Sequence, residues 1–80
     1  MTMLTLDARK YNEEEKGKAI TEAFDSLSLG ERMIIINDND PSPILNQVGK
    51  ERDGKLEWEP IVEGPDQWEA TVSKRYLNYI

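Results

Sequence analysis

The chain has 80 residues, a net charge of −6 and neither cysteine nor histidine, which predicts one small acidic domain. An acidic surface disfavours nucleic-acid backbones and anionic membranes, and the lack of cysteine excludes disulfides and thiol chemistry. No apolar run approaches the roughly 20 residues that span a bilayer, so we expect no membrane segment and a cytoplasmic location. We also expect no cofactor.

The first predicted elements are a short strand over about residues 2–7 and a helix that begins after Asn12. Asn12 suits an N-cap, and glutamates fill the next turn, where the helix dipole favours negative charge. Apolar residues recur at helical spacing as far as Leu27. Gly17, inside this helix, costs roughly 1 kcal/mol relative to alanine. The charged residues expected to face solvent are Lys16, Lys18, Glu22 and Asp25.

The centre of the chain is an apolar strand that leads directly into a second helix. Residues 33–36 are Met-Ile-Ile-Ile, a run typical of a buried strand. Asp40 is expected to be the N-cap of the second helix, with Pro41 at its first position, where the missing N–H costs little. This helix should extend to about Glu51. Polar residues therefore gather beyond the carboxyl end of a strand, a common place for sites in α/β domains.

Two further strands are expected on either side of the turn at residues 64–66. In the first, Trp58 and Val62 share one phase and glutamates take the other, while Pro60 favours a position at the sheet edge. In the second of these strands, apolar and polar residues alternate from Trp68 onward. We expect both tryptophans to belong to the core or the hairpin rather than to a ligand-stacking platform.

The element order β-α-β-α-β-β predicts an α+β fold, a two-layer sandwich with both helices on one face of the sheet. A right-handed first crossover would make the first two strands parallel. We assign residues 1–74 to a single domain and residues 75–80 to an apolar C-terminal extension.

Five polar residues that follow the first and second strands form the candidate ligand-binding set: Asp7, Arg9, Asp38, Asn39 and Asp40. Together they could bind a small ligand, or Asp38 and Asp40 could bind a hard cation through their oxygens, with Asn39 or a backbone carbonyl assisting. The alternative is structural: helix capping, an Asx turn and a bidentate pair between Arg9 and a carboxylate that holds the loops together. We favour the structural interpretation and assign no metal ligand. No catalytic residue is assigned either, because open alternating strands offer no pocket that would shift paired carboxylate pKa values apart.

The central strand is apolar on both faces, although a sheet covered on one side only should alternate. Met3 and Ile61 add to this outer apolar surface. We expect residues 76–80 or another molecule to cover it. This pattern favours a non-catalytic interaction module that acts through a protein partner or as a weak homodimer across the outer sheet face.

Two motifs resemble the TusA/SirA-like superfamily of small sulfur-carrier domains. They are Leu-Asp-Ala-Arg at residues 6–9 and Asn-Asp-Asn-Asp-Pro at residues 37–41. The likeness is closest to an uncharacterised branch, a domain of unknown function, marked by Asp-His-Asp-Pro after the second strand. The branch also carries Trp-Glu and Glu-Gly-Pro, found here at residues 58–59 and 63–65. The resemblance implies a four-stranded mixed sheet.

The chain departs from these relatives at two points. Sulfur carriers hold Cys-Pro at the start of the first helix, where this chain has Glu13 and Glu14, so sulfurtransferase chemistry is excluded for the chain alone. The histidine of the uncharacterised branch is Asn39 here. Relatives of that branch are joined to redox-related domains, which implies an accessory role in redox or nitrogen-oxide metabolism.

Overall fold

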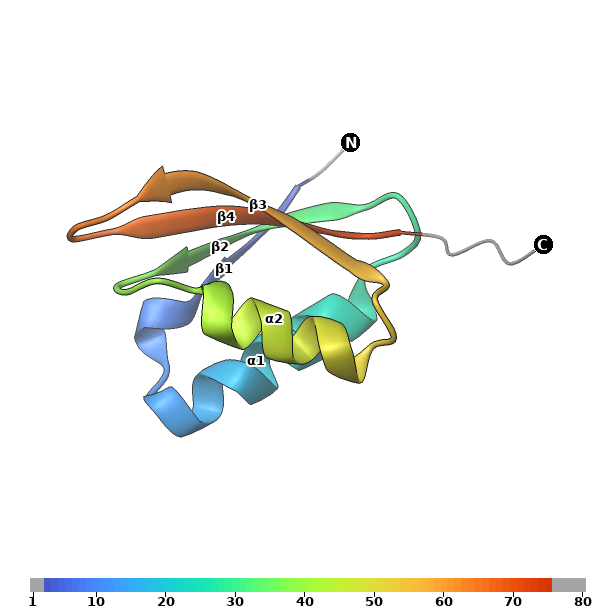
Figure 1. The fold of residues 1–80 in the computed structure, drawn as a ribbon, viewed down its shortest axis with the longest axis horizontal. Helices are drawn as coiled ribbons and strands as arrows, with labels where there is room; N and C mark the ends of the chain where they lie inside the picture. The colour runs from blue at the N-terminus through green and yellow to red at the C-terminus, as the bar shows by residue number, and fades with distance from the viewer. Residues whose placement is uncertain (1–2, 76–80) are drawn as a thin grey trace.

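The computed structural model describes residues 3–75 as a two-layer sandwich in which two helices cover one face of a four-stranded sheet (Figure 1). Its elements are β1 (Leu4–Asp7), the 3₁₀ turn η1 (Ala8–Lys10), α1 (Glu13–Ser26), β2 (Arg32–Asn37), α2 (Ser42–Glu51), β3 (Leu56–Glu63) and β4 (Trp68–Lys74). The strand order is β1-β2-β4-β3, with β1 parallel to β2 and the other neighbours antiparallel. The predicted α+β fold and element order are confirmed.

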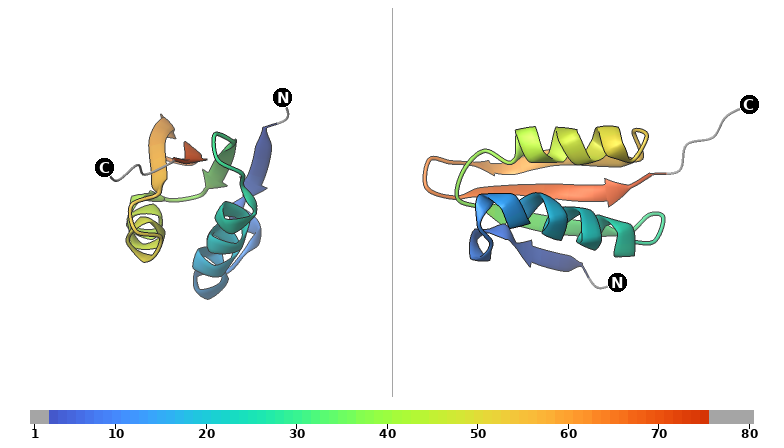
Figure 2. Two further views of the ribbon diagram at one scale, coloured as in Figure 1. Left: turned by 90° about the vertical axis from the view of Figure 1, so that its right-hand side faces the viewer. Right: turned by 90° about the horizontal axis from the view of Figure 1, so that it is seen from below.

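Strand β2 lies inside the sheet and turns alternate residues to its two faces. Met33 and Ile35 are fully buried beneath the helices, whereas Ile34 and Ile36 are half-buried on the opposite face. Figure 2 shows both helices on the same side of the sheet. The core lies between these layers, and its buried apolar members are Ala8, Ile20, Phe24, Leu27, Met33, Ile35, Leu45, Val48, Leu56, Ala70 and Val72.

The two helices begin in different ways. Asn12 caps α1 as predicted, because its Oδ1 accepts a hydrogen bond from the Glu15 N–H at 2.9 Å. The prediction for α2 is wrong by one residue. The Pro41 carbonyl accepts the first helical bond, from Leu45 N–H at 2.9 Å, so Pro41 is the N-cap. Asp40 stands just before the cap and accepts a hydrogen bond from the Ser42 N–H at 2.9 Å. Neither helix within residues 3–75 is long and apolar enough to cross a membrane.

Strand β3 forms one edge of the sheet and carries an irregularity beside Pro60. The pairing register shifts between Pro60 and Val62, which leaves Val62 opposite Glu69. Because Glu69 also pairs with Ile36, Val62 lies on the outer face, and the prediction that it shares the phase of Trp58 is wrong. One extra residue at a β-bulge reverses the alternation that follows it.

The two tryptophans occupy separate positions in the hairpin. Trp58 lies opposite Val72 and packs against the core, and its Nε1 donates a hydrogen bond to Asn46 Oδ1 at 3.2 Å. Trp68 lies opposite Glu63, and its ring approaches Gly64 so closely that a Cβ there would lie 2.7 Å from the ring. The tryptophans therefore belong to the core and the hairpin, as predicted. Residues 76–80, which were expected to cover the sheet, lie outside the described residues.

Alanine substitutions along β2 should give unequal losses of stability. We expect Ile35→Ala to reduce the free energy of unfolding by about 2–5 kcal/mol, because it leaves a cavity in the core. Ile36→Ala should cost only about 1–2 kcal/mol, because Ile36 is half-buried on the outer face. Urea unfolding of the two variants measures this difference, and equal small losses would contradict the central place of β2.

Candidate functional site

The predicted site residues lie at one end of the sheet. Strands β1 and β2 are parallel, so Asp7 and the loop after Asn37 follow the same edge. The β3–β4 turn reaches this end as well, because β4 runs antiparallel to β2. Figure 1 places η1, the β2–α2 loop and this turn together at the left of the molecule. The sequence prediction that residues around Asp7 and Asp38 come near one another is consistent with this arrangement.

Asp7 and Arg9 form a bidentate ion pair within one short segment. Arg9 Nε and Nη2 lie 2.8 and 2.9 Å from the two carboxylate oxygens of Asp7, and the Arg9 N–H adds a third hydrogen bond at 3.1 Å. These bonds from Arg9 hold the pKa of Asp7 at about 2. Arg9 Nη1 also donates to Gln67 Oε1 at 3.2 Å. The pair therefore links the end of β1 to the β3–β4 turn.

Asp38 pairs with Lys16, a residue whose position in the sequence predicts a solvent-facing side chain. The Lys16 side chain is only 2% exposed, and its Nζ lies 2.9 Å from Asp38 Oδ1 and 3.2 Å from Glu13 Oε1. Burial lowers the pKa of Lys16, but the hydrogen bonds to Asp38 and Glu13 raise it more, so the net shift is upward. The hydrogen bond from Lys16 lowers the pKa of Asp38.

The expectation that Lys16 faces solvent is therefore wrong, and the sequence did contain a signal. Lys16 stands four residues before Ile20 and eight before Phe24, which puts it on the buried stripe of α1. Its aliphatic stem is buried and its ammonium reaches Asp38 at the end of the sheet. Gln67 also contacts a predicted site residue, although it is not among the residues that the sequence predicts for the site. No local pattern connects it to Arg9, 58 residues earlier.

The remaining candidates hold the β2–α2 loop in place. Asn37, at the end of β2, is 1% exposed, and its Nδ2 donates to the backbone oxygen of Asn39 at 3.1 Å and to Asn39 Oδ1 at 2.7 Å. Asp40 accepts from the backbone and hydroxyl groups of Ser42, and these bonds lower the pKa of Asp40.

The three carboxylates of the predicted site are therefore directed to three different partners: Arg9, Lys16 and Ser42. Within residues 3–75 no group of three or more acidic side chains is gathered in a way that could hold a metal ion. Each of these contacts holds a loop in place or joins two elements. These contacts are consistent with a structural role for the residues, although the bidentate pair joins Arg9 to Asp7 of its own segment and not to the loop after β2.

Substitutions at Lys16 separate the packing of its stem from the effect of its charge. We expect Lys16→Ala to lower the free energy of unfolding by about 2–3 kcal/mol, because it removes buried methylene groups. Lys16→Met keeps most of that apolar volume and should cost less than about 1 kcal/mol, since the freed carboxylates of Asp38 and Glu13 are exposed enough to be hydrated. Denaturant unfolding compares the variants, and equal losses would show that the ion pairs dominate.

Removing the guanidinium of Arg9 should raise the pKa of Asp7 from about 2 toward its ordinary value of 3.8. Because the folded-state pKa is depressed, the pair stabilises the fold fully above about pH 4, and this contribution disappears as the pH falls toward 2. NMR titration of the Asp7 carboxyl in the wild type and in Arg9→Ala measures the shift. Asp25, which pairs with Arg52 instead, is the internal control.

Comparison with known proteins found one family model that matches most of the chain. The model of a family described as "Uncharacterized conserved protein (DUF2249)" matches residues 5–74, from β1 to the end of β4. No curated protein and no solved structure matches the chain. The match covers most of the sequence and every strand and helix of the sandwich, and the chain therefore belongs to this uncharacterised family, DUF2249.

Proposed function

We propose that this chain is a non-catalytic protein-interaction module that binds its partner through the outer face of the sheet. The observation that carries the proposal is the position of Ile34 and Ile36. Both lie in the middle of the sheet on the face opposite the helices, where no segment within residues 3–75 covers them (Figure 2). An apolar centre on an open face is typical of a binding surface.

The surroundings of these isoleucines support the same proposal. Pairing places a ring of mainly polar side chains around them on the outer face: Thr5, Asp7, Val62, Glu69, Thr71 and Ser73. A small apolar centre with a polar rim is the usual anatomy of a protein interface. The β3 edge is less suited to pairing with another strand, because it carries Pro60 and a register shift. Contact through the face is therefore favoured over strand addition at this edge.

The chemistry of the sheet end supports a non-catalytic role. Its carboxylates and its buried lysine are already held by internal partners, whereas an acid or base catalyst needs a group free to exchange a proton with substrate. The likeness to sulfur carriers suggests a shared scaffold, but Glu13 occupies the place of the thiol and bonds to Lys16. An accessory role beside redox or nitrogen-oxide enzymes belongs to this proposal on the strength of the resemblance.

A second copy of the chain is the partner we test first. A homodimer across a two-fold axis would bring the two pairs of isoleucines together. It would also bring together acidic residues such as Glu59 and Glu69, whose repulsion keeps the contact weak. Salt screens such repulsion, so we expect self-association to increase with ionic strength.

Sedimentation of three proteins tests this surface: the wild type, Ile34→Lys and the control Leu29→Lys. Leu29 is 58% exposed and lies in the loop before β2, outside the sheet face. We expect self-association of the wild type and of the control, and its loss in Ile34→Lys, because a lysine at the centre of the interface must be desolvated. Melting temperatures establish that each variant is folded.

The same three proteins serve as baits in native lysate. If the wild type is monomeric but captures a protein that Ile34→Lys fails to capture and Leu29→Lys retains, the module binds another protein through the same face. If all three are monomeric at millimolar concentration and capture the same proteins, the outer face is not a binding surface and the proposal is wrong.

A further inference from the structure

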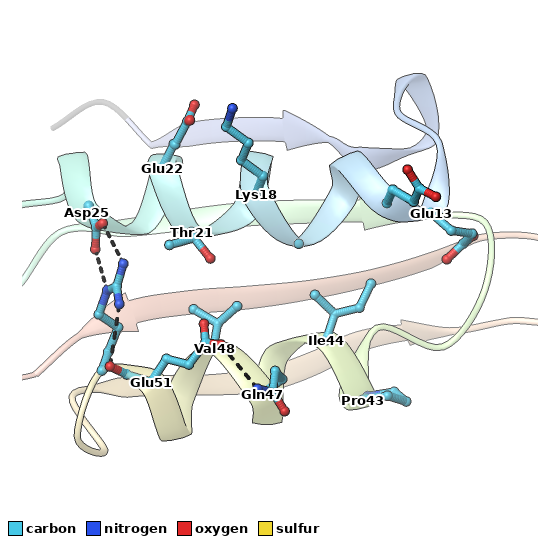
Figure 3. A pocket seen from close by; sticks show the side chains of 13 residues that line it. Glu13, Lys18, Thr21, Glu22, Asp25, Pro43, Ile44, Gln47, Val48 and Glu51 are labelled. Atoms are coloured by element: carbon cyan, nitrogen blue, oxygen red, sulfur yellow. Dashed lines mark hydrogen bonds and ion pairs between the residues drawn. The ribbon is translucent and has the colours of Figure 1, made fainter.

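A groove runs between α1 and α2, on the layer opposite the open sheet face (Figure 3). Its volume is about 720 Å³. Helix α1 supplies one wall and α2 the other, and the Asp25–Arg52 ion pair joins the walls near their C-terminal ends at two contacts of 2.8 Å.

The residues in the middle of the groove are apolar or weakly polar, and one of them, Gly17, is a glycine that the packing of the fold does not require. Ile44 and Val48 line the α2 side, and Thr21 faces them from α1 (Figure 3). Gly17 also lines the groove on the α1 side. A Cβ added to Gly17 would meet nothing within 4 Å, so the fold has no steric need for glycine here. Glycine in a helix interior destabilises the helix relative to alanine. Its effect at this position is to lower the α1 wall and widen the groove.

The rim of the groove is acidic. Five carboxylates line it against two cations, and two of the carboxylates are already paired, Asp25 with Arg52 and Glu13 with the buried Lys16. Glu14 and Glu22 on α1 and Glu51 on α2 leave negative charge on both sides of the apolar middle. A ligand with positive charge along its edges and an apolar stripe between them would complement this arrangement.

We infer that the groove binds a lysine- or arginine-rich amphipathic helix of a partner protein. The shorter wall, α2, has 10 residues and is about 15 Å long, which matches roughly three turns of a bound helix. Apolar residues at i, i+3, i+4 and i+7 of that helix would meet Gly17, Thr21 and Ile44, the partly exposed residues in the middle of the groove, as in other helix-in-groove complexes. The inference is independent of the proposed function, because the groove and the outer sheet face belong to opposite layers.

NMR titration of the full chain with two synthetic peptides tests the charge requirement. Both peptides have about 14 residues with leucines at i, i+3, i+4 and i+7, and the other positions are lysine in one and glutamate in the second. We expect the lysine peptide to shift the amide signals of Gly17, Thr21 and Val48, with weaker binding at high salt. The glutamate peptide should bind at least about tenfold more weakly. A lysine peptide of identical composition with its leucines scrambled is the control for charge alone.

Variants of Gly17 test the shape requirement. Gly17→Leu fills the groove and should weaken binding of the lysine peptide at least about tenfold. Gly17→Ala should raise the melting temperature by about 4–8 °C, since it removes a helix-interior glycine without a clash. Thr21→Lys, which adds a charge in the middle of the groove, provides a second test should Gly17→Leu fail to fold.

The inference is wrong if the peptides of opposite charge bind alike, if the scrambled peptide binds as tightly as the patterned one, or if the shifted signals lie around Ile34. It is also wrong if a folded Gly17→Leu variant binds the lysine peptide as the wild type does. If the groove does not bind the peptide, association through Ile34 is unaffected. If Ile34 plays no part in association, peptide binding in the groove is likewise unaffected, so the two proposals can be judged separately.

Discussion

The fold depends on strand β2, which pairs with a neighbour on each side and contributes two residues to the core between the sheet and the helices. Its two pairings differ in direction, parallel to β1 and antiparallel to β4. Met33 and Ile35 are fully buried on the helix side. This arrangement brings three connections to one end of the sheet and leaves a second row of isoleucines on the other face. Loss of β2 packing would therefore remove the polar cluster and the outer surface together.

Charge in this acidic chain is used first to hold the fold together. Arg9 joins Asp7 to the β3–β4 turn, and Lys16 joins α1 to the loop after β2. Arg52 and Asp25 join the far ends of the two helices. Exposed ion pairs contribute little energy individually, but these connect elements that are distant in sequence. The end of the sheet where α/β domains often bind ligands is occupied here by internal contacts.

Small size explains why uncovered surface remains on both layers. A domain of 80 residues buries only about 60–65% of the surface of its unfolded chain. With two helices and four strands in residues 3–75, one face of the sheet is left without a covering layer. The two helices in turn leave a groove between them that Gly17 widens. The outer surface is centred on isoleucines and the groove is rimmed by carboxylates, so the two would select different partners.

The sequence by itself determined the elements and their order, because capping and side-chain periodicity are local. Asn12 caps α1 as its position predicts, and the apolar run before Asn37 forms the central strand. Only the tertiary structure decided the rest. The β-bulge that turns Val62 outward depends on pairing with β4, and the contact of Arg9 with Gln67 joins residues 58 positions apart. Such contacts follow from how elements pack and pair, which no local pattern specifies.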